Sequence, residues 1–541
     1  MLHRGVSECE GCSACLRLQE IQSKIRECKE LLDKLYIQEA HTKSSVNAAH
    51  DPIIRRLPLE LVSNIFTLCN PNPVETDEEF GSSPPEAPLT THRYQFSLGA
   101  VCTTWRNIVR STPQLWTDIY FQFPIRRGGE LQYREFLLLS LRLSGTLPLH
   151  IQAREPFLRD YTGRDYRAHS SFLELLNDHS NRWNTLDLCI SPLFLPHIKG
   201  VTPGAPNLKR LRIHLLGRPE EQINSTFQLS FGLPSPQIVE ISGITFSMMG
   251  IGWKNATKVE LGTLNMEECL KLLRQATQLV DFAVDLLISE DSGLPGLGEV
   301  VTAPRLASWK VDILDTEGEV FSRLDLPSLA SLDLSGFYSL DSLGHLLSRS
   351  MCPLQFLSLS TDGITIADAI PILQTTPLLK QLVFSQVPLD GLDELFDILA
   401  RTKLVGDASQ IGNMVFLPHL EDLSFLRIQD YLPPWHLVPL LFPPTWNSAN
   451  AQYRPLRRLE FRISFDEFDL ARRLDKDVVL QIREIQQRGY DISIWNEEDS
   501  IVIDFIQFSY EHHFGSQRSK GDGPEVEEEE EADEGGSDAE S

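Results

Sequence analysis

Three cysteines near the start of the chain have a spacing that could bind a metal. Cys9, Cys12 and Cys15 are each separated by two residues, which suits thiolate pairs on a tetrahedral zinc ion. A closed site needs a fourth ligand, and the nearest candidates, Cys28 and His3, lie near or within a predicted helix. No second Cys-x-x-Cys pair completes a standard zinc finger. We therefore predict no bound metal, and free thiols on a segment that leads into the helix.

Other residue patterns that would support catalysis are missing from the sequence. There is no Gly-rich phosphate loop followed by Lys-Ser/Thr, no Gly-x-Ser-x-Gly elbow and no His-Glu-x-x-His helix. The glycines between Gly293 and Gly298 have the wrong spacing for a dinucleotide site. His512 and His513 are adjacent, so their side chains do not converge on one face, and we interpret them as solvated surface. We expect a protein that is not an enzyme and has no cofactor.

The charge of the chain is strongly acidic, with a formal net charge of −26 over 541 residues. This argues against nucleic acid as a partner, because such binding relies on Lys and Arg. Residues 521–541 contain eleven acidic side chains and no basic one. We predict a disordered acidic tail over 516–541, which we interpret as solubilising in preference to a docking site for a basic partner.

Cysteine usage and hydropathy indicate the compartment. Nine cysteines, an odd number, do not resemble a disulfide framework. Residues 1–7 contain no apolar run, so we expect no signal peptide. No run of about 18 apolar residues occurs, so we expect no membrane span. The expected location is cytoplasmic, nuclear or both.

Residues 16–42 are predicted to form one helix with a narrow apolar seam. The apolar residues alternate at spacings of three and four, the a/d pattern of a heptad repeat. They are Leu18, Ile21, Ile25, Cys28, Leu32 and Leu35. Two interpretations stay open: the helix packs on a neighbouring helix of the same chain, or it mediates homodimerisation. We assign residues 1–50 to this Cys-rich start and heptad helix.

Two further helices are predicted on either side of a polar segment. The break at Asp51-Pro52 ends the heptad helix, because proline disfavours helical geometry in the residue before it. A helix is expected at 59–69 and another at 96–110, while residues 71–93 are rich in proline and acids and are predicted to form a mobile loop. These segments make up a helical region over 51–120.

A repeated apolar frame follows from about residue 183. It reads apolar, two variable residues, apolar, one variable residue, apolar, and most steps between copies are 23 to 27 residues. Ten full copies start at residues 183, 208, 256, 279, 306, 329, 354, 379, 420 and 456, with a weaker copy at Ile238/Ile241/Gly243. This period lies within the range of leucine-rich repeats. Steps of 41 and 36 residues near 379–456 indicate insertions or a degenerate repeat.

Short amphipathic stretches between the frames predict a unit of strand, turn, helix and turn. Such a unit cannot bury its apolar face alone, so neighbouring units must stack. We predict a leucine-rich-repeat-like α/β solenoid, a horseshoe, over residues 131–515. A terminal hairpin over 489–509, with its turn at 496–500, is expected to cap it. Alternation in each strand should place frame residues such as Leu332, Leu357 and Leu382 inside and the residues between them outside.

The helical region resembles an F-box. Its first half is Leu57-Pro58-Leu59-Glu60-Leu61 followed by Ile65-Phe66, and its second half is Val101-Cys102-Thr103-Thr104-Trp105-Arg106. The segment Ser111-Thr112-Pro113-Gln114-Leu115-Trp116 is similar to the end of that motif. The match covers about 53–120. The whole layout resembles the large F-box family of mushroom-forming (basidiomycete) fungi, with a heptad helix before the motif, an insertion within it and degenerate leucine-rich repeats after it.

This resemblance implies a function in ubiquitination. The F-box would bind the adaptor subunit of an SCF-type (Skp–cullin–F-box) ubiquitin ligase, and the repeats would bind an unknown target protein. The implied adaptor-binding residues are Leu57, Pro58, Leu61, Ile65, Phe66, Val101, Cys102 and Trp105. From the strand alternation we propose Ser331, Asp333, Ser358 and Ser360 for target binding. The alternative is a leucine-rich-repeat scaffold that is not coupled to ubiquitination.

Overall fold

The computed structural model describes most of the chain in sixteen segments. They are residues 13–50, 52–70, 94–122, 130–154, 173–201, 207–216, 226–230, 232–288, 299–314, 319–360, 363–402, 415–429, 433–443, 454–464, 473–498 and 501–514. The chain divides into two compact units, Met1–Gly262 and Thr263–Ser541. Cys9, Cys12, the predicted loop at 71–93 and the predicted tail at 516–541 lie outside the described residues.

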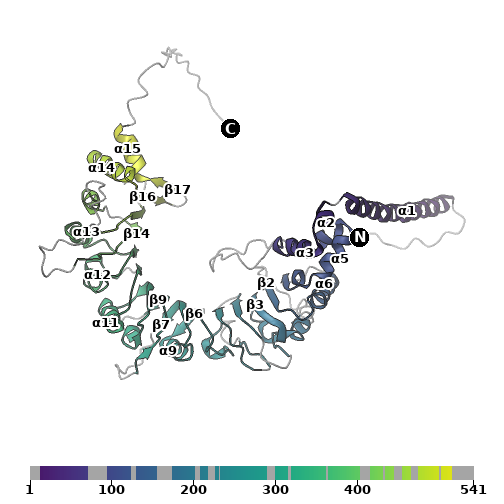
Figure 1. Cartoon of the computed structure of the whole chain (residues 1–541), viewed down its shortest axis with the longest axis horizontal. Helices are drawn as coiled ribbons and strands as arrows, with labels where there is room; N and C mark the ends of the chain where they lie inside the picture. Colours follow the sequence, from purple (N-terminus) through teal and green to yellow (C-terminus); the bar gives the residue numbers. More distant parts are fainter. Residues whose placement is uncertain are drawn as a thin grey trace, which may run out of the picture. The chain divides into compact units, whose positions relative to one another are not determined.

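The first unit begins with helices and continues into parallel strands (Figure 1). Its helices are α1 (Ser13–His50), α2 (Pro52–Arg56), α3 (Leu59–Leu68), α4 (Tyr94–Val101), α5 (Thr103–Ser111), the 3₁₀ helix η2 (Pro113–Trp116) and α6 (Glu130–Leu143). Its strands are β1 (Asp118–Gln122), β2 (Leu149–Arg154), β3 (Trp183–Ile190), β4 (Arg210–Leu215), β5 (Ile238–Ser242) and β6 (Lys258–Asn265), the last ending just past the unit boundary. Each strand from β1 to β6 pairs in parallel with the next one in sequence.

The second unit repeats a strand-and-helix alternation. Its helices are α9 (Met266–Gln275), α10 (Glu319–Ser322), α11 (Leu340–Ser350), α12 (Ile366–Leu373), α13 (Leu392–Arg401), η6 (Trp435–Leu441), α14 (Lys476–Gln487) and α15 (Phe505–Phe514). Its main strands are β7 (Asp281–Ile288), β9 (Ser308–Leu314), β11 (Ser331–Phe337), β12 (Phe356–Ser360), β13 (Gln381–Ser385), β14 (Asp422–Gln429), β15 (Arg458–Ser464), β16 (Asp491–Glu498) and β17 (Ile501–Asp504). All of these pair in parallel and in sequence order except β17, which is antiparallel to β16. A separate short pair joins β8 (Val301–Thr302) to β10 (Leu324–Asp325).

The apolar frame forms the interior of these strands. Every residue of the ten full frames is buried. Leu332, Leu357 and Leu382 face one another on β11, β12 and β13, and Leu423 and Leu459 extend the row on β14 and β15. The predicted register is therefore confirmed for these strands. Helices α11, α12 and α13 follow along one side of the strands in Figure 1, and they bury leucines and isoleucines from their own apolar faces.

The weak copy of the frame was placed two residues too late. The residues that continue the buried rows on β5 are Val239, opposite Leu211, and Ile241, opposite Ile213. Ile238 lies on the other face and is only half-buried. The error arose because Ile238 and Ile241 also satisfy the three-residue spacing of the frame.

Three predicted elements have different boundaries in the structure. The helix expected at 96–110 is two helices, because Cys102 adopts an extended conformation between α4 and α5 and caps α5. The terminal hairpin is confirmed by β16 and β17, but residues from Phe505 onward form α15 instead of continuing the strand. The heptad helix is longer than expected and occupies all of α1.

The seam of α1 is exposed along its length. Its six seam residues are all exposed, the five Leu and Ile side chains by 47–56%. This excludes packing of the seam on any described part of the same chain, the first of the two interpretations above. No described helix is long and apolar enough to span a membrane.

Candidate functional site

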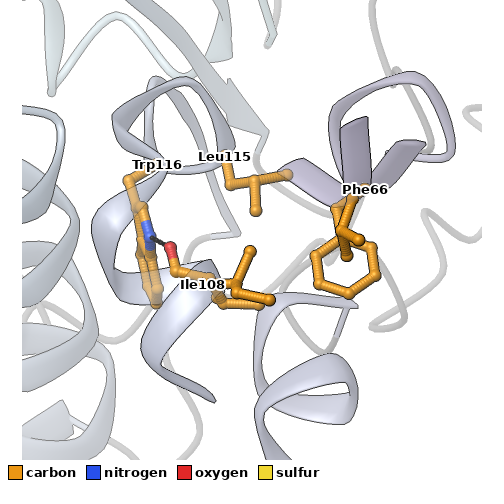
Figure 2. Close-up of a cluster of buried hydrophobic side chains, with 6 residues drawn as sticks. Phe66, Ile108, Leu115 and Trp116 are labelled. Carbon is orange, nitrogen blue, oxygen red and sulfur yellow. Dashed lines mark hydrogen bonds between the residues drawn. The ribbon is translucent and has the colours of Figure 1, made fainter. Parts of the chain in front are cut away.

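A small hydrophobic core holds the helices α3, α5 and η2 together (Figure 2). Its buried residues are Val62, Phe66, Ile108, Val109, Leu115 and Trp116. The core combines the first and second halves of the sequence motif, although residues 71–93 separate them in the chain. The insertion therefore leaves the helices of the two halves packed against each other.

Specific hydrogen bonds fix the relative positions of these helices. The Trp116 indole donates to the carbonyl of Val109 at 2.8 Å (Figure 2). Tyr94 on α4 donates its hydroxyl to the carbonyl of Phe66 at 2.8 Å, and Gln95 donates to the carbonyl of Leu115 at 2.7 Å. Partial burial, and secondarily the nearby Cys69, raise the pKa of Tyr94, so its hydroxyl keeps the proton that it donates.

The opposite face of α3 is apolar and exposed. Leu61, Ile65 and Leu68 follow one another at spacings of four and three residues, so they share one face of the helix. Their exposed fractions are 48%, 37% and 85%. Val62 and Phe66 on the other face are buried in the core. We call Leu61, Ile65 and Leu68 the α3 stripe. The buried Val62 and Phe66 fix α3 on the core, and the α3 stripe is exposed to solvent.

The other predicted adaptor-binding residues differ in their exposure. Pro58 is exposed, whereas Leu57, Val101 and Trp105 are half-buried. Phe66 and Cys102, which we expected at the binding surface, are buried inside the helical region. Adjacent residues in a helix point about 100° apart, so Phe66 cannot share the face of Ile65. The Phe66 ring instead packs on Trp105, with 4.7 Å between ring centroids.

The outward face of the strands in the second unit carries the predicted target-binding residues. Asp333 on β11 faces Ser358 on β12, and Ser360 faces Ser335 one step along. Ser331, Asp333 and Ser360 are partly exposed. Lys310 on β9 completes this polar row, because it faces Asp333 with 4.0 Å between the charged groups. Lys310 was not among the residues predicted to bind a target.

Ser358 is more enclosed than the strand alternation predicted. It is only 8% exposed, although the neighbouring Leu357 is fully buried as expected. The register is therefore correct, and the small serine is covered because it lies between Asp333 and Val383 on the adjacent strands. We correct the expectation that Ser358 points freely into solvent.

In the first unit the equivalent sheet face is occupied by an internal ionic network. Asp187 on β3 contacts Arg154 on β2 at 3.0 Å and Arg212 on β4 at 3.6 Å. Arg212 also pairs with Glu240 on β5. Burial raises the pKa of the Asp187 carboxyl, and Arg154 and Arg212 oppose that effect. These ion pairs connect four strands, although the Oδ1 atom of Asp187 is buried without a hydrogen-bond partner. We assign the network to holding the strands together.

The structure offers no support for a metal centre within the part of the chain that it describes, where no group of three or more His, Cys, Asp or Glu side chains is arranged to hold an ion. Cys28 is exposed on α1. His513, which we expected to be solvated, is half-buried and hydrogen-bonds the carbonyl of Leu474 at 2.8 Å.

Comparison of the chain with protein-family models and with curated proteins finds no match.

Proposed function

We propose that this protein is the substrate-recognition subunit of an SCF-type ubiquitin ligase, and that it works by binding and without an active site of its own. The F-box, residues 51–120, would bind the adaptor, which connects to the cullin. The strands and helices that follow would form a leucine-rich-repeat-like solenoid that holds a target protein.

The α3 stripe is the observation that carries the adaptor half of this proposal. A helix whose inner face is locked into a core normally presents polar residues to solvent. Here the outer face presents Leu61, Ile65 and Leu68. Covering such residues with a partner removes apolar surface from water, which is favourable in proportion to the area. The stripe coincides with Leu61 and Ile65 of the F-box motif, which supports adaptor binding as its purpose.

The proposed binding of a target protein is supported by three outward-facing polar side chains, Lys310, Asp333 and Ser360, which we call the polar row. Lys310, Asp333 and Ser360 stand on three neighbouring strands whose inward residues are locked in register. A rigid sheet can therefore hold variable side chains at fixed spacings, and those side chains can change without disturbing the core.

A co-purification experiment tests the adaptor interaction. Full-length protein carrying Leu61→Asp and Ile65→Asp should lose binding to the Skp-type adaptor, because an interface cannot bury unpaired carboxylates without a large cost. Leu68→Asp alone should weaken it. Asn107→Asp is the matched control: it adds the same carboxylate at an exposed polar position of α5, outside the α3 stripe, and should leave binding intact.

Circular dichroism should show that all variants keep the wild-type fold, because the replaced side chains lie outside the core. Failure of the wild-type chain to bind the adaptor would refute the ligase proposal and favour the scaffold alternative.

A further inference from the structure

The heptad seam of α1 is an apolar surface that the adaptor proposal does not use. The seam residues Leu18, Ile21, Ile25, Leu32 and Leu35 are about half exposed, and Cys28 is exposed between them. Figure 1 shows α1 extending away from α2, α3 and α5. Its C-terminal end is attached to α4, where Asn47 donates a hydrogen bond to the carbonyl of Val101 at 2.6 Å.

We propose that this seam is a self-association surface, and that two copies of the chain pair through α1 as an antiparallel two-stranded coiled coil. The proposal is independent of adaptor binding, since the seam and the α3 stripe are on different helices.

The spacing of the seam specifies a helix as its partner. Apolar residues at alternating steps of three and four repeat every 3.5 residues, and this period fits knobs-into-holes packing against another helix. The seam runs from Leu18 to Leu35, so it is about 26 Å long at 1.5 Å per residue.

The composition of α1 permits two copies to approach. It contains six Lys and Arg residues against five Asp and Glu residues, whereas the chain as a whole carries −26. Because the helix is nearly neutral, like-charge repulsion between two copies of it is weak. Four of its charges form two ion pairs within the helix, Lys24–Glu20 at 2.6 Å and Lys43–Glu39 at 2.7 Å.

Flanking charges determine the orientation. In the heptad, Lys24 occupies position g and Lys29 occupies position e. In a parallel, in-register pair these positions face each other across the interface, so Lys24 of each copy would meet Lys29 of the other. An antiparallel pair brings g to g and e to e, which removes both of these contacts.

The antiparallel pairing also matches every apolar layer. With Ile25 opposite Cys28 of the second copy, Leu18 lies opposite Leu35 and Ile21 opposite Leu32. A shift by one heptad would instead place Ile21 opposite Glu39.

In the proposed pairing, with Ile25 opposite Cys28, the Asn47 residues of the two copies lie about 60 Å apart along the coiled coil, at 1.5 Å per residue. The two F-boxes therefore stay clear of each other.

Light scattering of the full-length chain at micromolar concentration tests self-association. The wild-type mass should approach twice the chain mass of 61.3 kDa. Ile25→Asp should return it to the single-chain mass, because the seam would bury a carboxylate. Ser23→Asp, on the solvent side of the same helix, is the matched control and should stay dimeric. A monomeric wild type, or a dimer that tolerates Ile25→Asp, would overturn the proposal.

Disulfide trapping tests the orientation. Leu18→Cys and Leu35→Cys chains should form a covalent dimer after diamide treatment only when they are mixed, above the background of the unmodified chain. Trapping of Leu18→Cys with itself would show a parallel pair and overturn the antiparallel assignment.

Discussion

At the scale of single residues, the buried arginine Arg454 caps the C-terminal end of α13 in the second unit. Arg454 is almost fully buried, and its hydrogen bonds go to backbone carbonyls, Leu399 at 2.7 Å and Phe416 at 2.7 Å among them, and to the Thr402 hydroxyl at 2.8 Å. Burial lowers the pKa of Arg454 to about 10, so the group stays charged at neutral pH. A guanidinium suits this position because it has five donors and the last helical carbonyls lack partners.

Replacement of this arginine should destabilise the C-terminal end of α13. We expect Arg454→Met to lower the free energy of unfolding by about 3 kcal/mol, the upper end of the usual cost of stranding buried hydrogen-bonding groups. Urea unfolding would measure the loss, and hydrogen exchange over residues 392–402 would locate it. Arg457→Met, at an exposed position nearby, is the control and should change stability by less than about 0.5 kcal/mol. Equal effects of both substitutions would contradict the capping role.

At the scale of elements, the strands derive their stability from rows of leucines that cross several repeats. Leu357 on β12 touches the rows of β11 and β13 and is fully buried. Its removal leaves a cavity that two neighbouring strands border, so the surroundings cannot easily collapse to fill it.

We therefore expect Leu357→Ala to cost about 2–5 kcal/mol. The neighbouring Ser358→Ala should change stability by less than about 0.5 kcal/mol, because serine to alanine leaves no comparable void. Thermal unfolding of both variants provides the comparison. A large loss in Ser358→Ala with little in Leu357→Ala would mean that the inward and outward faces had been exchanged.

The sequence predicted the strands well because a frame with fixed spacing repeats in ten full copies, and each copy constrains the next. It predicted helix boundaries less well, because these depend on single capping contacts. Cys102 caps α5 through its sulfur, an acceptor that sequence rules do not weigh. Asp504 caps α15 through bonds to Ile506 and Gln507, both at 3.0 Å, and an aspartate before an apolar stretch was a readable signal.

The exposed apolar face of α3 could be predicted from the sequence, because residues three and four apart lie on the same side of a helix. Leu61 and Ile65 came from the motif, and Leu68 continues their face at the next turn. The motif also included Phe66 and Cys102, which are buried. A family sequence pattern contains both the residues that form the core and the residues that contact a partner, and it does not distinguish them. Burial of the Arg454 side chain could not be foreseen, since the nearby Arg457 has the same side chain and is exposed.

At the scale of the whole molecule, the two proposed binding surfaces belong to different compact units. The α3 stripe lies in Met1–Gly262, and the polar row of Lys310, Asp333 and Ser360 lies in Thr263–Ser541. The residues of each surface lie on elements that are packed within their own unit, so we expect a substitution on one surface to leave the other unchanged. Adaptor binding and target binding should therefore be separable.

Asp333→Lys combined with Ser360→Arg should abolish ubiquitination of the proteins that the wild-type chain modifies in a reconstituted ligase, because the polar row changes its charge and shape. Its affinity for the adaptor should stay within about twofold, as expected for distant and independent sites. Leu61→Asp with Ile65→Asp should do the reverse: those same proteins still bind, but they are no longer modified. Ubiquitin-remnant mass spectrometry and adaptor titration measure the two effects. Undiminished ubiquitination by the sheet variant would place target binding elsewhere, whereas a shared loss of adaptor affinity would show that the two units are coupled.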